Sequence, residues 1–161
     1  YSVMNIELVH PVSKLAIRPH DNKWLENFLF VYERLSVDNL GLLNNVYHKD
    51  IIFTDPMHKV EGLDNLKKYF DDLYENLNSC VFRIDNVIAQ LDQAAVYWQM
   101  TYQHDKLNNG AIVSVSGHSH IKGDGEKIYY HRDYLDLGAM LYEQLPFFGR
   151  LIKWLKARAI K

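Results

Sequence analysis

The fold is decided by residues 80–106, which read CVFRIDNVIAQLDQAAVYWQMTYQHDK. Two runs rich in apolar, β-branched and aromatic side chains are separated here by the dipeptide Asp92-Gln93. A two-residue interruption between such runs is a β-hairpin signal. This stretch therefore predicts two long antiparallel strands, Cys80–Leu91 and Ala94–Lys106.

Two further strands continue the pattern. Asn108-Asn109-Gly110 and Gly123-Asp124-Gly125 are turn sequences, and they bound predicted strands at residues 111–121 and 127–137. Strands of about eleven residues exceed the usual five or six, and strands that long bend. We therefore expect a curved antiparallel sheet.

Helical patterns precede the sheet. The first predicted helix begins at Asp21 or Asn22, either of which is a suitable N-cap, a second begins near residue 39, and a third follows Gly62. A short extended run, residues 51–55, lies between the second and the third. Helices grouped before strands indicate the α+β class, with the sheet wrapping the helices. The apolar stripes expected to be buried are Trp24, Phe28, Val31 and Leu35; Leu40, Leu43, Val46 and Tyr47; and Leu63, Leu66, Phe70, Leu73 and Leu77.

The composition excludes several classes of protein. Among 161 residues, 18 Lys and Arg stand against 20 Asp and Glu, so a basic surface for nucleic acid is not expected. No window approaches the ~18 apolar residues of a membrane span. The single cysteine, Cys80, excludes an internal disulfide, and the absence of a signal-peptide pattern makes a cytoplasmic protein the simplest interpretation. The 11 Tyr, 7 Phe and 3 Trp are enough to line an apolar pocket as well as a core.

The C-terminal segment, Met140–Lys161, is predicted to be a helix of a different kind. From Pro146 onward it contains no acidic residue and five cations, Arg150, Lys153, Lys156, Arg158 and Lys161, with Leu151, Trp154, Leu155 and Ala159 on the opposite face. Such a helix either docks on its own or a neighbouring subunit, or lies on an anionic membrane surface. Docking is the favoured interpretation.

The order of these features resembles the nuclear-transport-factor-2-like superfamily. The features that match are Phe53-Thr54-Asp55-Pro56 after two helices, a helix opening at Gly62, and a last strand reading KIYYHRDYLD over residues 127–136. Within the superfamily the chain is most similar to SnoaL-like proteins, named for polyketide cyclases, with ketosteroid isomerases as cousins. The resemblance covers about residues 22–145. It implies a cone-shaped α+β barrel, a deep apolar pocket and commonly a homodimer through the outer sheet face. The expected organisation is an extension (1–20), the domain (21–145) and a basic amphipathic helix (146–161).

The resemblance implies two catalytic carboxylates. The Asp of the Asp-Pro pair is the general base of ketosteroid isomerases and corresponds to Asp55, whereas the acid–base Asp of SnoaL-like cyclases corresponds to Asp133. A carboxylate at the rim of an apolar pocket can take a proton from carbon and return it. The residues alone leave other interpretations open, because Asp before Pro56 is a common turn residue and Asp133 could pair with Arg132.

Further site residues follow from strand alternation and from the resemblance. His131 shares a strand face with Asp133, where an imidazole can shuttle protons, and Tyr32 is the expected hydrogen-bond donor. Ser119 stands where ketosteroid isomerases carry a protonated Asp, so steroid isomerisation is not expected. The strand 111–121 has neither acid nor Arg, which also argues against epoxide hydrolysis of the limonene type. The predicted ligand-binding residues are Trp24, Phe28, His58, Trp98, Met100, Tyr102, Ser119 and Leu135.

No metal and no cofactor are expected. His118 and His120 share a strand face, and alternation with Val113 and Val115 directs them outward, toward solvent or a dimer interface, whereas a bulge at Gly117 would turn them toward the pocket. Two functions remain open: a cofactor-free enzyme acting on a small apolar carbonyl or polyketide-like compound, and a non-catalytic binding protein for an apolar ligand or lipid. Two carboxylates near one pocket favour the enzyme.

Overall fold

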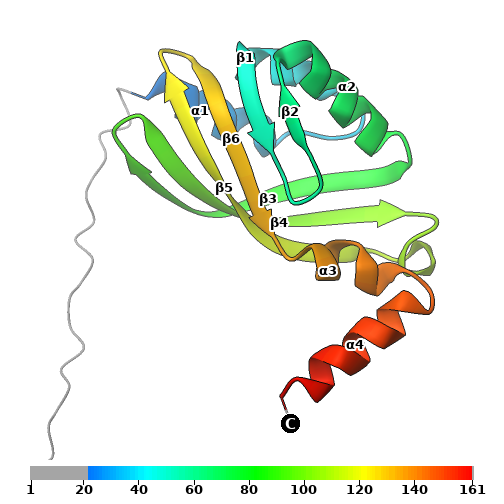
Figure 1. The fold of residues 1–161 in the computed structure, drawn as a ribbon. Helices are drawn as coiled ribbons and strands as arrows, with labels where there is room; N and C mark the ends of the chain where they lie inside the picture. Colours follow the sequence, from blue (N-terminus) through cyan, green and yellow to red (C-terminus); the bar gives the residue numbers. More distant parts are fainter. Residues whose placement is uncertain (1–21, 161) are drawn as a thin grey trace, which may run out of the picture.

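The computed structural model describes residues 22–160, so the predicted extension 1–20, the alternative cap Asp21 and Lys161 lie outside the described residues (Figure 1). The helices, with 3-10 helices written η, are α1 (Lys23–Tyr32), η2 (Leu40–Asn45), α2 (Leu63–Tyr74), η3 (Asn108–Gly110), α3 (Leu137–Met140), η4 (Tyr142–Gln144) and α4 (Phe148–Arg158). The strands are β1 (Tyr47–Thr54), β2 (Lys59–Glu61), β3 (Leu77–Gln90), β4 (Gln93–His104), β5 (Val113–Asp124) and β6 (Lys127–Leu135).

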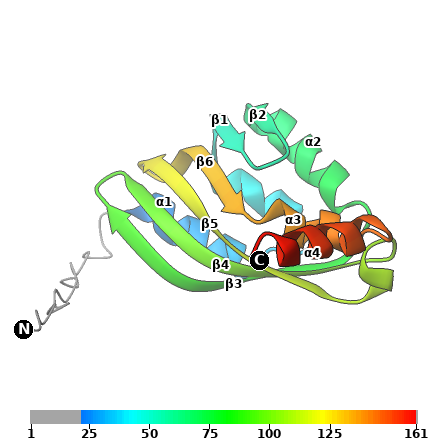
Figure 2. The same cartoon turned by 60° about the horizontal axis from the view of Figure 1, so that its bottom comes forward.

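Within the described residues, six strands form one curved, open sheet in the order β2-β1-β6-β5-β4-β3. The helix α1 packs on β5 and β6, and α2 packs on β1, β2 and β3; Figure 2 shows both helices on the concave side of the sheet. This arrangement confirms the α+β class. The expectation of a purely antiparallel sheet needs one correction, because β1 pairs with β6 in parallel. Parallel neighbours require a long crossover connection, here the chain from β1 through β5.

The prediction of a second α-helix, beginning near residue 39, is wrong. Residues 40–45 form a short 3-10 helix, and Tyr47 opens β1 instead of continuing a helical stripe. The end of α2 also differs from the prediction, because Leu77 begins β3 and Leu73 is 37% exposed. Tyr47 and Leu77 have helical spacing from their apolar neighbours, but each belongs to a strand that pairs with a distant part of the chain. A local sequence pattern does not reveal such pairing.

The predicted C-terminal helix, which was expected to begin at Met140, is interrupted: α3 ends at Met140, and the separate helices η4 and α4 follow it. Pro146 disfavours a helical backbone at the preceding residue, and Leu145 is accordingly extended. None of the helices within residues 22–160 has the length and apolar character needed to cross a membrane.

The core is largely aromatic and includes Trp24, Phe28, Tyr32, Tyr47, Phe53 and Trp98. This packing leaves no room for a side chain at Gly123. The ring of Trp24 lies directly over Gly123, so that a Cβ built on Gly123 would be only 2.2 Å from the ring. A larger residue at this position would displace a buried indole.

We therefore expect Gly123→Ala to lower the free energy of unfolding by about 1–3 kcal/mol, the usual cost of overpacking a core. Gly41→Ala is the matched control, because a Cβ at Gly41 would have nothing within 4 Å. Urea denaturation measures both variants. If both were as stable as the unmodified protein, Trp24 would not be packed against Gly123.

Candidate functional site

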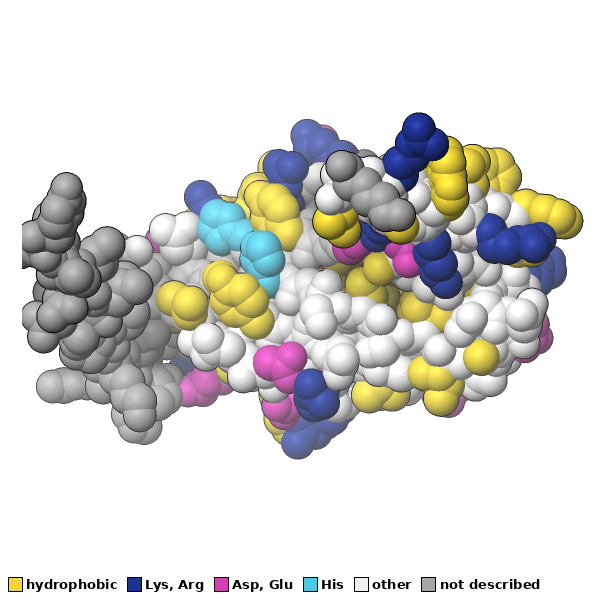
Figure 3. Space-filling view, turned by 90° about the horizontal axis from the view of Figure 1, so that it is seen from below, with side chains coloured by type: hydrophobic (Ala, Val, Ile, Leu, Met, Phe, Trp, Pro, Cys, Tyr) yellow, Lys and Arg dark blue, Asp and Glu magenta, His cyan; other side chains and the backbone are white. Residues whose placement is uncertain are grey.

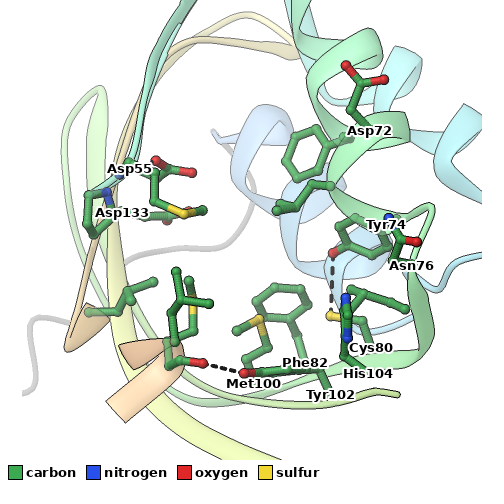
Figure 4. Close-up of a pocket in the computed structure, with 18 of the residues that line it drawn as sticks. Asp55, Asp72, Tyr74, Asn76, Cys80, Phe82, Met100, Tyr102, His104 and Asp133 are labelled. Atoms are coloured by element: carbon green, nitrogen blue, oxygen red, sulfur yellow. Dashed lines mark hydrogen bonds between the residues drawn. The ribbon is translucent and has the colours of Figure 1, made fainter. Parts of the chain in front are cut away.

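An apolar cavity of about 280 Å³ lies between α2 and the concave face of the sheet (Figure 4). Its volume is near the lower end of the range for small-molecule sites, roughly 300 Å³. The walls are chiefly aromatic and aliphatic, and include Phe53, Phe70, Phe82, Trp98, Met100 and Leu135.

The structure brings half of the predicted site residues to this cavity. Those that line it are Asp55, Asp133, Trp98, Met100, Tyr102 and Leu135, whereas Trp24, Phe28, Tyr32, His58, Ser119 and His131 do not. Figure 4 shows Asp55 and Asp133 on one wall, with Tyr74 and Cys80 across the cavity from them. The two carboxylates are neighbours because β1 and β6 pair in parallel up to Thr54 and Arg132, each one residue before an Asp.

Asp133 is held by two hydrogen bonds to the same oxygen. Its Oδ1 accepts from Ser119 Oγ at 2.5 Å and from His131 Nε2 at 2.7 Å. Ser119 Oγ in turn accepts from Trp98 Nε1 at 2.9 Å. The hydroxyl that holds Asp133 is therefore itself held in place by a side chain of the neighbouring strand, β4. The Asp133 side chain is 18% exposed, while His131 is fully buried. Within residues 22–160, the other oxygen, Oδ2, takes part in none of the hydrogen bonds, which leaves it able to receive a proton.

A chain of buried tyrosines continues behind His131. Tyr47 Oη lies 2.7 Å from His131 Nδ1, and Tyr32 Oη lies 2.5 Å from Tyr47 Oη. A carboxylate only accepts hydrogen bonds, so Nε2 of His131 carries the proton toward Asp133. The hydroxyl of Tyr47 is within hydrogen-bond distance of the other ring nitrogen, Nδ1, and of the Tyr32 hydroxyl behind it. Tyr32 therefore does not face the cavity but orients the His131 imidazole through Tyr47. The part played by Tyr47 in this chain was not predicted from the sequence.

Asp55 has the geometry of a turn residue. Its Oδ1 accepts from the backbone N–H groups of Met57 at 2.7 Å and His58 at 2.8 Å, and its Oδ2 accepts from the Tyr69 hydroxyl. His58 is exposed, and its ring packs against Tyr69 with centroids 5.3 Å apart. Because both Asp55 oxygens are occupied, Asp55 fits the turn role better than the role of a free base.

The opposite wall provides a hydroxyl proton. Cys80 Sγ donates to Tyr74 Oη at 3.5 Å, so Tyr74 keeps its own O–H proton for another acceptor (Figure 4). Burial raises the pKa of Cys80 to about 11 and also raises the pKa of Tyr74 well above its usual value. At neutral pH both groups therefore remain protonated, and Tyr74 can donate to a carbonyl oxygen placed in the cavity.

We expect the protein to lose stability in alkaline solution. Burial raises the pKa values of Tyr32, Tyr47, Tyr74 and Cys80, so above the ordinary values of 9.0 for Cys and 10.0 for Tyr the folded state keeps protons that the unfolded chain releases. The free energy of unfolding is therefore at its full value below these pH values and falls as the pH rises through them.

A pH titration followed by phenolate absorbance and by circular dichroism measures this effect. We expect the absorbance of the buried tyrosines to appear together with loss of the folded signal, and Tyr74→Phe to reduce the dependence on pH. Complete phenolate formation with an unchanged dichroism spectrum would contradict the burial of these hydroxyls.

His118 and His120 alternate along β5 with the buried Ser119 and Ile121, so they lie on the outer face of the sheet, and neither lines the cavity. The ring of His118 stacks between Tyr97 and Tyr134, with centroids 5.2 and 4.8 Å away. His120 Nε2 lies 2.9 Å from the side-chain oxygen of Gln93. Among the described residues, no three His, Cys, Asp or Glu side chains come together in a way that would hold a metal ion.

Comparison with known proteins identifies the fold. A sequence model of the SnoaL-like domain matches residues 30–131. A protein described as a SnoaL-like polyketide cyclase from Jannaschia sp. CCS1 is 16% identical, with a TM-score of 0.66 over 76% of this chain and 92% of that chain. A protein described as a polyketide cyclase from Acidithiobacillus ferrooxidans is 20% identical, with a TM-score of 0.63 over 78% and 96%. TerC, co-crystallised with polyporic acid, is 16% identical, with a TM-score of 0.63 over 73% and 95%. No curated protein sequence matches the chain.

Proposed function

The chain belongs to the SnoaL-like domain family, and we propose that it is a cofactor-independent acid–base enzyme acting on a small apolar carbonyl compound. The observation that carries this proposal is the setting of Asp133. One oxygen is fixed by Ser119 and His131 while the side chain borders an apolar cavity. A positioned carboxylate in an apolar cavity is suited to moving a proton to and from carbon.

The proposed step is proton transfer next to a carbonyl. Asp133 Oδ2 takes a proton from the carbon beside the carbonyl group, so that a C–H bond breaks and an O–H bond forms. The electron pair moves onto the carbonyl oxygen, and the O–H of Tyr74 donates to that oxygen from across the cavity. Asp133 then returns the proton to the substrate, which completes an isomerisation or follows formation of a new carbon–carbon bond.

His131 is a positioning residue in this proposal. Its Nε2–H holds Oδ1, and the hydrogen bonds from Tyr47 and Tyr32 hold its ring. The cavity volume suits a compound of one or two rings, and its aromatic walls favour an apolar one. TerC, whose fold is similar, was co-crystallised with polyporic acid, which supports an organic ligand for a cavity of this kind.

The proposal is tested by following the exchange of the α-hydrogens of 2-tetralone, a small apolar ketone, with deuterium from D₂O by NMR. We expect the protein to accelerate exchange above the buffer rate, and Leu135→Trp to abolish the acceleration because the indole fills the cavity. Tyr134→Trp is the matched control, since the neighbouring side chain lies on the outer face. Equal acceleration by both variants would place the reaction outside the cavity.

A non-catalytic binding protein is the second candidate function. The observation that favours it is Asp55, both of whose oxygens are occupied, so that of the two carboxylates predicted to be catalytic only Asp133 has an oxygen left to receive a proton. The same experiment separates the two functions. A binding protein would hold 2-tetralone in the cavity without accelerating the exchange of its α-hydrogens.

A further inference from the structure

The helix α4 carries an apolar face that the rest of the described chain leaves uncovered. Five apolar side chains on this face are each more than half exposed. They are Phe147, which directly precedes the helix, and Phe148, Leu151, Trp154 and Leu155 within it. Figure 1 shows α4 extending away from the sheet after α3 and η4. A contiguous apolar surface of this kind on a folded protein marks an interaction site.

The contacts of α4 with the domain set the direction of this face. Gly149 is buried against the backbone of Glu143, where a Cβ would lie 2.2 Å from the carbonyl oxygen. Two turns further on, Lys156 pairs with Asp136 at 3.3 Å and also with Glu143. Gly149 and Lys156 are seven residues apart and so lie on one side of the helix. This side faces the domain, and the apolar side chains point away from it.

The charged side chains that α4 itself carries are all positive. No acidic residue follows Glu143, although the whole chain has a net charge of -2. Arg150, Lys153 and Arg158 are exposed, and two of them lie over aromatic rings of the same face: Arg150 over Phe147 at 5.4 Å and Arg158 over Trp154 at 5.3 Å. Figure 3 shows Lys and Arg side chains flanking hydrophobic ones around α4.

We propose that α4 binds the surface of an anionic lipid bilayer. The aromatic and Leu side chains would enter the boundary between headgroups and acyl chains, and Arg150 and Arg158 would contact the lipid phosphates. Charge complementarity favours this partner over a second α4, which would bring the same cations together. Met140 and Leu141 line the cavity and precede α4 closely, so binding would hold one cavity wall near the bilayer. This inference does not depend on the proposed chemistry.

Sedimentation of the full chain with lipid vesicles tests the inference. We expect binding to vesicles of phosphatidylcholine with phosphatidylglycerol, weakened by salt, and little binding to phosphatidylcholine alone. Trp154 is 53% exposed while Trp24 and Trp98 are buried, so a blue shift of tryptophan fluorescence on binding reports on α4. The double variants Leu151→Gln with Leu155→Gln, and Arg150→Gln with Arg158→Gln, should each lower partitioning at least about tenfold.

Matched controls remove an exposed leucine, or a pair of exposed cations, elsewhere on the surface. Leu91→Gln, and Lys49→Gln with Lys68→Gln, should bind vesicles as the unmodified protein does, and thermal melting should show that all variants fold. Equal binding to both kinds of vesicle, or equal loss in the α4 and control variants, would overturn the inference. Absence of vesicle binding together with a lower molecular mass of the α4 variants would also overturn it, in favour of a second copy of this chain. Proton exchange of 2-tetralone in solution would be unchanged in every case.

Discussion

Asp133→Asn is expected to slow the protein-dependent exchange of 2-tetralone by about 10²–10⁴-fold, the usual contribution of a positioned general base. The asparagine side chain keeps an oxygen that can accept from Ser119 and His131, so the surrounding contacts are preserved. It has no basic oxygen to receive a proton from carbon. We therefore expect the melting temperature to stay within a few degrees of the original while the NMR exchange rate falls to that of the buffer.

Asp55→Asn is the matched control for this variant. Asp55 accepts two backbone hydrogen bonds and the Tyr69 hydroxyl, so its replacement should lower stability by about 1–3 kcal/mol and change the exchange rate little. The proposal would be contradicted by the opposite pattern, in which Asp133→Asn lowers the melting temperature and leaves exchange intact.

Phe28→Ala is expected to have the largest effect on stability. Phe28 is 1% exposed, its ring stacks on Tyr32 with centroids 4.1 Å apart, and it lies 5.7 Å from the ring of His131. Removing a buried aromatic ring leaves a cavity and costs about 3–5 kcal/mol. For a chain of this length that corresponds to a fall in melting temperature of about 10 °C.

Phe30→Ala on the same helix is the control for Phe28→Ala. Phe30 is 57% exposed, with Arg34 over its ring, so its truncation should change the free energy of unfolding by no more than about 0.5 kcal/mol. Thermal and urea denaturation of the pair measure the difference. Similar losses in both variants would show that α1 does not bury the Phe28 face.

Most of the fold could be predicted because its elements have strong local patterns. The first hairpin appears one residue earlier than predicted, with Leu91 and Asp92 in the turn and Gln93 already in β4. The turn at Gly125 lies where the sequence indicates it, and Gly62 precedes α2 as expected. The parallel pairing of β1 with β6 could not be read in this way, because it joins segments more than seventy residues apart that share no local pattern. The break before α4 could have been predicted from Pro146, because a proline disfavours a helical backbone at the residue before it.

The candidate site was predictable only in part for the same reason. Strand alternation is enough to place His131 and Asp133 on one face, but the contact from Ser119 and Trp98 depends on the register of three strands. Tyr74 could have been found, since it continues the α2 stripe of Leu66 and Phe70 at intervals of four. Tyr47 was hidden because its apolar neighbours have helical spacing.

A crystal structure of the protein with 2-tetralone bound tests the central claim most directly. The account predicts that the ketone occupies the cavity, with its carbonyl oxygen at hydrogen-bond distance from Tyr74 Oη and its α-carbon about 3–3.5 Å from the Asp133 carboxylate. Binding outside the cavity, or in the cavity with the α-carbon far from Asp133, would contradict it.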